Sequence, residues 1–246
     1  MPSIEPEPEI IDDGLRKGLA GRGFLHLSAS AFRNWIDLED QIEFEGFASS
    51  WEELGPDLYM ADGGRYRRRR YAAFALSTDH IRRLTHRPHF QSRDYNRLNG
   101  DIQRWFEPVA DEIATSRIIR TLATGLTAVF TSLEGQGRDQ NWLCELHQIR
   151  IEAANDVPGL PTPEGLHRDG VDWVLVMLVR RHNVKAGTTQ IRDERGGGGD
   201  FTLREPGEAV LLNDRRIRHG VTPITPLDPR QSAFRDVLVM TWKKLV

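Results

Sequence analysis

Three residues with metal-binding side chains stand out by their spacing. His167 and Asp169 are two positions apart, and His219 follows 50 residues after Asp169, at the end of a strand-like segment. Residues i and i+2 of a strand point to the same side, so His167 and Asp169 can reach one ion. Two histidines and a carboxylate form the facial triad of non-haem Fe(II) oxygenases, which leaves coordination positions open. A hydrogen-bonded His–Asp pair in a loop is the alternative interpretation.

A buried cation near such a triad would matter if the co-substrate is 2-oxoglutarate. This acid chelates iron through its C1 carboxylate and keto oxygen, and its C5 carboxylate then needs a partner. Arg235 lies 16 positions after His219, at the start of the apolar segment 234–242. Its guanidinium can bind a carboxylate with two parallel hydrogen bonds. Arg230, in a loop-like segment, is the second candidate, and a surface pair of Arg235 with Asp236 is the alternative.

The elements that would position these residues change in character along the chain. A short strand is expected at 23–27, and apolar residues at helical spacing then cover 31–42, 78–84 and 107–122. The second half contains segments typical of strands, separated by Pro and Gly turns, at 145–152, 173–179, 188–191, 201–203, 209–212 and 237–242. This order predicts an α+β fold with a β-sandwich or jelly-roll core.

The boundaries of this fold follow from the same patterns. The β core is expected over about 145–246, with the helices at its N-terminal flank. Residues 1–9 alternate Glu and Pro and are predicted to be a disordered tail. No repeat or low-complexity linker divides the rest, so we expect a single domain spanning 1–246.

Composition narrows the class of protein. The 246 residues carry a formal net charge of −3, so no overall charge attracts nucleic acids or anionic membranes. No apolar run approaches the roughly 18 residues of a membrane-spanning helix, and the acidic N-terminus does not look like a signal peptide. Cys144 is the only cysteine, which excludes an intramolecular disulfide and a thiolate metal cluster. We expect a cytoplasmic protein that binds a small molecule but neither nucleic acid nor membrane.

One basic segment departs from this average composition. Arginine occupies position 65 and positions 67–70, between and beside tyrosines. On a strand, alternate arginines face opposite sides, so at most half of them can line one surface. A wall of a substrate pocket and a solvated basic strand are the main interpretations. Contact with nucleic acid is the third, and the short run in an acidic chain disfavours it.

Several ordered motifs together resemble a known family. They are Leu146-His-Gln-Ile-Arg150, Leu166-His-Arg-Asp169, Leu203-Arg-Glu-Pro206, His219-Gly-Val-Thr-Pro223 and Ala233-Phe-Arg-Asp-Val-Leu238. In this order they resemble the bacterial Fe(II)/2-oxoglutarate-dependent dioxygenases that hydroxylate free L-amino acids, the isoleucine dioxygenase-like family. The similarity is densest over the last hundred residues and extends to 90–96 and 17–27.

This resemblance implies a distorted double-stranded β-helix, a cupin-like jelly roll, with iron at one mouth. It implies that His167, Asp169 and His219 bind Fe(II) and that Arg235 binds the C5 carboxylate of 2-oxoglutarate. Thr222 would add a hydroxyl to the same network. The cofactors implied are Fe(II), 2-oxoglutarate and O2.

The substrate contacts are expected on neighbouring strands. His147 and Ile149 share one side of a strand and Gln148 and Arg150 the other, and one of these pairs is expected to face the pocket, ordinary strand pairing being the alternative. Arg150, or an arginine of the basic segment, would bind the substrate's carboxylate. The candidates for these contacts are His147, Gln148, Arg150, Asp172, Arg68 and Arg70. Asp172 is included because Gly170 and Val171 stand where the isoleucine enzymes carry acids.

The function implied is hydroxylation of a C–H bond in a free L-amino acid or a close derivative, with release of succinate and CO2. Desaturation, sulfoxidation, or oxidation of a carrier-bound or peptidyl substrate with the same cofactors is the first alternative. The second is a cupin-like protein that binds a metal or ligand without turnover. The specific amino acid, the carbon oxidised and the oligomeric state are left open.

Overall fold

A computed structural model describes residues 8–37, 41–77, 79–135, 140–154, 157–194 and 196–245. The helices are α1 (Pro8–Arg22), α2 (Ala29–Trp35), α3 (Gln41–Ser49), the 3₁₀ helix η1 (Ser50–Glu53), α4 (Asp111–Ala114) and α5 (Arg117–Leu133). The strands are β1 (Phe24–Leu27), β2 (Arg67–Leu76), β3 (Ile81–Arg83), β4 (Glu107–Pro108), β5 (Trp142–Ala153), β6 (Trp173–His182), β7 (Val184–Ala186), β8 (Thr189–Asp193), β9 (Gly198–Phe201), β10 (Ala209–Asn213), β11 (Ile217–Val221), β12 (Ile224–Pro226) and β13 (Ala233–Lys244). Residues 1–7 of the predicted tail lie outside the described residues, and α1 begins at Pro8.

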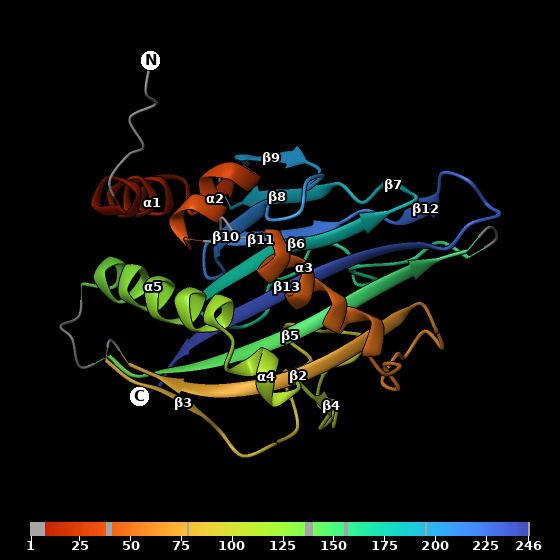
Figure 1. The fold of residues 1–246 in the computed structure, drawn as a ribbon, viewed down its shortest axis with the longest axis horizontal. Helices are drawn as coiled ribbons and strands as arrows, with labels where there is room; N and C mark the ends of the chain where they lie inside the picture. Colours follow the sequence, from red (N-terminus) through yellow and green to blue (C-terminus); the bar gives the residue numbers. More distant parts are fainter. Residues whose placement is uncertain are drawn as a thin grey trace.

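Three sheets make up the β structure of the described residues (Figure 1). The main sheet has the strand order β1-β10-β6-β13-β5-β2-β3, and β4 pairs with β2 at its edge. The smaller sheets have the orders β11-β8-β9 and β12-β7. This arrangement confirms the predicted α+β jelly roll with helices at its flank. The first four strands precede residue 145, so the β core begins earlier in the chain than predicted.

The helix predicted over 78–84 is wrong. Its described residues contain β3, which runs antiparallel to the end of β2, with Leu76 opposite Ile81. A backbone hydrogen bond from Ser77 N to His80 O closes the turn between the two strands. The free edge of β2 provides backbone partners for this short segment, and tertiary partners of that kind override a weak helical pattern.

Helix α5 packs along one face of the main sheet. Ser116 caps its N-terminus by accepting a hydrogen bond from the backbone N–H of Ile119. Ile118, Ile119 and Leu122 are buried against the sheet, as their spacing predicted. Two tryptophans of the sheet donate their indole N–H groups to threonines of the helix, Trp142 to Thr131 and Trp242 to Thr127, each over 3.0 Å. No helix in the described part of the chain combines the length and the apolar character needed to cross a membrane.

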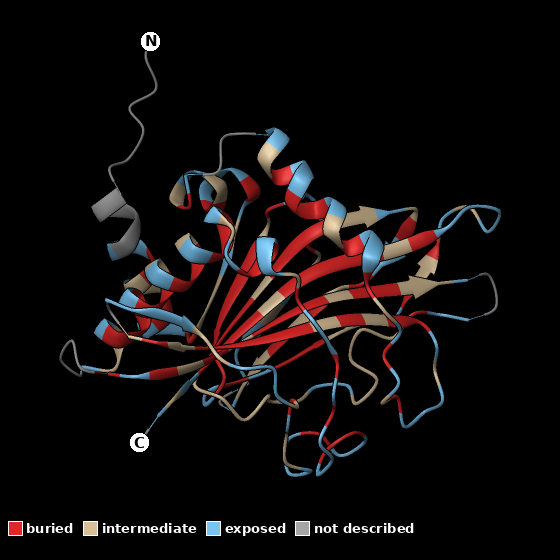
Figure 2. Cartoon of the chain, turned by 60° about the horizontal axis from the view of Figure 1, so that its bottom comes forward, coloured by how far each residue is buried: buried red, intermediate tan, exposed pale blue. Residues whose placement is uncertain are grey.

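Side chains alternate between the two faces of the main sheet. Strands β5 and β13 pair over their whole length, with His147 opposite Val239 and Gln148 opposite Leu238. Leu238 and its neighbours of the same parity pack against the helices. Figure 2 shows the strands as mostly buried, whereas the outer surfaces of the helices that cover them are exposed. His147 and Val239 face the opposite way, into a cavity. A residue's parity on these strands therefore decides whether it can belong to a functional site.

A network of buried charges lies on the helix-covered face. The Asp236 carboxylate is fully buried and accepts hydrogen bonds from Arg150 Nε at 2.7 Å and Arg180 Nε at 3.1 Å. Both arginines also reach Glu52 on η1, over 2.8 and 2.7 Å. Arg150, predicted as a substrate contact, thus faces away from the cavity and links the sheet to η1.

We expect that Arg150→Met destabilises the protein by about 3 kcal/mol, because it leaves the buried Asp236 carboxylate with Arg180 as its remaining arginine partner. The free energy of unfolding from urea titration measures this loss. Exchanging both partners, as Arg150→Met with Asp236→Leu, should recover most of it, since no buried charge is then left unpaired. Equal losses in the single and double variants would contradict this account.

Candidate metal centre and its cavity

The three residues of the predicted triad come together in the structure. His167 and His219 are opposite one another, joined by backbone hydrogen bonds of 3.0 Å from His167 N and 2.9 Å from His219 N. Asp169 lies just beyond, with Oδ1 3.5 Å from His167 Nε2 and Oδ2 3.5 Å from His219 Nε2. The ligand atoms all lie within 4.8 Å of one another. Donor atoms 3.5 Å apart can each lie about 2.0–2.2 Å from one ion, the range that nitrogen and oxygen ligands of zinc show.

The electrostatics of the triad favour a bound cation. Against the effect of burial, the hydrogen bond and charge of Asp169 raise the pKa of His167 to about 9. Burial and the neighbouring His167 lower the pKa of His219 to about 4. The carboxylate therefore holds one positive charge in the cluster, and a metal ion can replace that proton on binding. His219 Nδ1 is buried without a hydrogen-bond partner among the described residues.

Contacts outside the triad fix its geometry. His167 Nδ1 lies 3.0 Å from the carbonyl oxygen of Gly165, which leaves Nε2 directed toward Asp169. The Asp214 carboxylate accepts hydrogen bonds from the backbone N–H groups of Asp169, Gly170 and Val171, over 3.0, 2.8 and 3.2 Å. Burial and the nearby Asp169 carboxylate raise the pKa of Asp214. Asp214 was not among the predicted site residues, because nothing in its local sequence indicates that it holds a loop 45 residues earlier.

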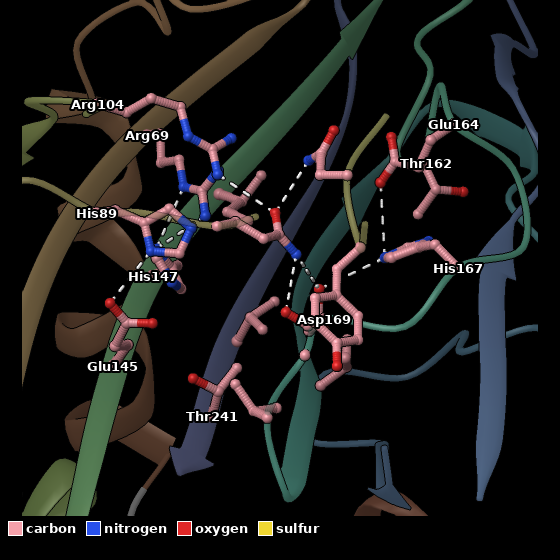
Figure 3. A pocket seen from close by; sticks show the side chains of 18 of the residues that line it. Arg69, His89, Arg104, Glu145, His147, Thr162, Glu164, His167, Asp169 and Thr241 are labelled. Carbon is pink, nitrogen blue, oxygen red and sulfur yellow. Dashed lines mark hydrogen bonds and ion pairs between the residues drawn. The ribbon is translucent and has the colours of Figure 1, made fainter. Parts of the chain in front are cut away.

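A cavity of about 400 Å³ adjoins the triad (Figure 3). The inward faces of β2, β5, β6 and β13 form one wall, and the triad lies on the other side with β11. The segment 87–96 and Arg104 also line it. Its volume lies near the lower end of the roughly 300–1,000 Å³ typical of small-molecule pockets.

Arg235 lines this cavity. Its position in an apolar strand predicted that it would be buried. Its side chain is almost fully buried, and Nε and Nη2 have no hydrogen-bond partner among the described residues. Burial and the neighbouring Arg181 lower its pKa to about 10, so the guanidinium keeps its charge. A buried cation with unpaired donors beside a possible metal site fits the distal carboxylate of 2-oxoglutarate. The competing candidate, Arg230, is exposed and pairs with Asp228.

Of the predicted substrate contacts, the structure brings His147 alone to the cavity. Gln148 and Arg150 lie on the other side of the same strand and face the helices. Gln148 Nε2 donates a hydrogen bond there to Ser50 Oγ over 2.8 Å. The prediction for this second pair is therefore corrected, and His147 with Ile149 is the pair that faces inward. The sequence left this choice open, because both parities of the strand carry polar residues.

The predicted arginines of β2 also have the wrong parity. Arg68 pairs with Glu152 over 2.7 Å, and Arg70 lies 3.7 Å from Glu107, both on the helix-covered face. Arg67 and Arg69 line the cavity in their place. A shift of one position along a strand exchanges the two faces, and the sequence of four consecutive arginines does not show which pair points inward.

Two further predicted contacts lie outside the cavity. Asp172 is 3.3 Å from Arg215 and accepts a hydrogen bond from the backbone N–H of Lys244 over 2.7 Å. The Thr222 hydroxyl accepts a hydrogen bond from the backbone N–H of Thr188 over 2.9 Å. Both side chains therefore stabilise local structure, and neither is among the residues that line the cavity.

A second histidine cluster faces the triad across the cavity. His89 Nδ1 lies 3.1 Å from Glu145 Oε1, and Arg69 Nη2 lies 2.9 Å from His147 Nδ1. The ligand atoms of His89, Glu145 and His147 are close enough to hold a metal. The guanidiniums of Arg69 and Arg104 nearby disfavour a second cation there, and together with burial they lower the pKa of His147. We therefore assign this cluster to the polar wall of the cavity.

Comparison with known proteins agrees with the metal site that the geometry indicates. The 2OG-Fe dioxygenase family matches residues 48–241. An L-isoleucine-4-hydroxylase from Bacillus thuringiensis is 25% identical over 226 residues, 90% of each chain. A 3(1)-hydroxy-L-isoleucine 4-dioxygenase from Pantoea ananatis is 26% identical over 159 residues, 64% of each chain.

A solved structure is more similar still. A bsmA homologue from Methylobium petroleophilum PM1 is 37% identical, with a TM-score of 0.86 over 94% of this chain and 92% of that one. The match of the family to most of the chain confirms the resemblance inferred from the sequence motifs. The chain belongs to the 2OG-Fe dioxygenase family and is a 2-oxoglutarate-dependent dioxygenase with Fe(II), 2-oxoglutarate and O2 as its cofactors and co-substrates.

Proposed function

We propose that this dioxygenase hydroxylates a C–H bond of a free L-amino acid or a close derivative. His167, Asp169 and His219 would hold Fe(II), and Arg235 would bind the C5 carboxylate of 2-oxoglutarate. The observation that carries the proposal is that the triad shares one small cavity with Arg235, whose Nε and Nη2 have no hydrogen-bond partner among the described residues. The names of the two curated relatives support an amino acid as the substrate.

In the proposed reaction, the residues of the chain bind the metal and the co-substrate and orient the substrate. When bound, the metal supplies the oxidising chemistry, in which O2, 2-oxoglutarate and a C–H bond give succinate, CO2 and a C–OH group. Asp214 and the Gly165 carbonyl hold two of the three ligand side chains in place. Val176, Val237 and Val239 form an apolar part of the cavity wall that can pack against the substrate's side chain.

The size of the cavity supports a free amino acid over a carrier-bound or peptidyl substrate. A volume of about 400 Å³ must hold the co-substrate as well as the substrate. A peptide would need an open groove instead. Membership of a dioxygenase family, and the buried donors of Arg235 that lack a partner among the described residues, likewise support turnover over a non-catalytic cupin.

The substrate can be found by screening. We expect that one of the twenty L-amino acids, incubated aerobically with Fe(II), 2-oxoglutarate and the protein, gives succinate together with a product 16 mass units heavier. His167→Ala should abolish both signals. Succinate release that no amino acid stimulates would contradict a free amino acid as substrate. An unchanged rate in His167→Ala would contradict the metal site.

Replacing Arg235 tests the co-substrate site. We expect Arg235→Met to weaken 2-oxoglutarate binding to the Mn(II)-loaded protein about 10- to 100-fold, because charge-assisted hydrogen bonds of roughly 1.5–3 kcal/mol are lost. Isothermal titration calorimetry measures the affinity. Arg230→Met, the exposed arginine of the loop before β13, is the matched control and should leave it unchanged. If the wild type and Arg235→Met bind 2-oxoglutarate with equal affinity, a cation other than Arg235 binds its C5 carboxylate.

Replacing Asp214 tests how the triad is held. Asp214→Ala removes the acceptor for three backbone N–H groups around Asp169, so we expect about 10- to 100-fold weaker Mn(II) binding. Equilibrium dialysis with metal analysis gives the affinity, and circular dichroism checks the fold. Asp228→Ala, which removes a carboxylate acceptor from the turn before β13, is the control, because Asp228 is not among the residues that line the cavity. Similar losses of metal affinity in both variants would show a general effect of lost turn contacts.

A further inference from the structure

Three arginines gather on the wall of the cavity that faces the triad. Arg67 and Arg69 come from the inward face of β2, and Arg104 comes from the loop before β4. Their exposed fractions are 7%, 9% and 1%. Figure 3 shows Arg69 and Arg104 beside one another, with His167 and Asp169 on the far side of the cavity. We call these three residues the arginine wall.

The charges of this wall are close enough to repel one another. Burial and then the charges of Arg67 and Arg104 lower the pKa of Arg69 to about 9. Burial and the charge of Arg67 lower the pKa of Arg104 as well. Buried like charges cost free energy unless an anion lies among them. An anion bound among these three guanidinium groups would therefore reduce their mutual repulsion.

The described residues leave part of this charge unpaired. Arg67 Nε donates to Asp57 over 2.6 Å, but its Nη2 is buried without a hydrogen-bond partner. Arg69 donates to the neutral His147 ring, and Arg104 Nη2 donates to the Gln91 amide oxygen over 3.3 Å. Arg104 Nε is also buried without a partner in the part of the chain described. Buried donors without acceptors are uncommon in folded proteins. Arg67 and Arg104 line the cavity, so a ligand bound there can accept hydrogen bonds from these donors.

The arginine wall is separate from Arg235. Across the main sheet Arg235 is opposite Ile151, and Ile151 is opposite Arg67. Two strand spacings therefore separate Arg67 from Arg235, about 10 Å between their backbones. The cavity thus contains two cationic positions, one on β13 and one on β2 with its neighbouring loop, and both face the triad.

We propose that Arg67, Arg69 and Arg104 bind the carboxylate of the substrate, while Arg235 binds that of 2-oxoglutarate. The proposal rests on the function proposed above and adds the place and charge of the group that the protein recognises. A carboxylate matches the planar guanidinium forks. Asp57 and Glu145 beside the wall keep negative charge, so a singly charged carboxylate suits it better than a phosphate dianion.

Gln91 connects this site to the triad. Its amide oxygen accepts the hydrogen bond from Arg104, and its Nε2 donates to the backbone oxygen of Asp169 over 3.0 Å. Asn96 Nδ2 donates to the same amide oxygen over 3.0 Å and fixes its orientation. A substrate held at Arg104 is therefore positioned relative to the metal ligands by a short chain of hydrogen bonds.

The test compares each of the twenty L-amino acids with its α-carboxamide, using the Mn(II)-loaded protein saturated with 2-oxoglutarate. Thermal melting identifies the amino acid that binds, and calorimetry gives both affinities. We expect the amide to bind at least 10-fold more weakly. Arg104→Met should weaken the amino acid at least 10-fold, leave the amide unchanged and change the 2-oxoglutarate affinity less than twofold.

Two further variants keep the test decisive. Arg104→Lys retains the charge and should recover part of the affinity for the amino acid. Arg97→Met removes an exposed arginine from the same loop and should change nothing. Unchanged amide and 2-oxoglutarate binding in Arg104→Met also shows that this variant is folded; if it fails to fold, Arg104→Lys and the wild-type amide comparison decide.

The possible failures are distinguishable. Equal affinity for an amino acid and its amide, or no binding of any amino acid to a protein that binds 2-oxoglutarate, would overturn the assignment of the arginine wall. Loss of 2-oxoglutarate binding in Arg104→Met with retention in Arg235→Met would also overturn it, because the two anion sites would be exchanged. A wild-type protein that binds Mn(II) but not 2-oxoglutarate would instead contradict the proposed function itself.

Discussion

The pairing of β5 with β13 along their whole length sets the two faces of the main sheet, and the site depends on that separation. On one face, Leu146, Met240 and Trp242 pack under the helices and bury apolar surface. On the other face, the same strands present Arg235 and His147 to a cavity. Because side chains alternate at every residue, the core and the site are built from one pair of strands without competing for positions.

The two faces use buried charge in different ways. On the helix-covered face, Asp236 meets Arg150 and Arg180, so the charges are paired within the protein. On the cavity face, Arg67, Arg104 and Arg235 each keep a buried donor without a hydrogen-bond partner among the described residues. Pairing within the protein offsets the cost of burying these charges, whereas the unpaired buried donors need a ligand to offset it.

The triad is constrained from several distant parts of the chain. His219 is fixed by the backbone pairing of β11 with His167, and Asp169 lies in a loop held by Asp214. Gln91 then joins that loop to the opposite wall through Arg104. The proposed metal ligands, their supporting contacts and the basic wall thus form one connected polar network around a cavity with apolar sides. This arrangement suits the proposed reaction, which must hold a small polar substrate in a fixed position.

The sequence alone determined the features that depend on residue type and local spacing. The order of helices and strands predicted the α+β jelly roll, the His167–Asp169 spacing with His219 predicted the triad that the structure brings together, and the apolar strand around Arg235 predicted its burial. Tertiary structure alone decided parity and long-range contact. It turned Arg150 and Arg68 toward ion pairs on the helix side, turned Arg67 and Arg69 inward, and brought Arg104 and Asp214 to the site. The physical reason is that a strand's sequence fixes which residues share a face, whereas which face meets the cavity depends on strands and helices far away in the chain.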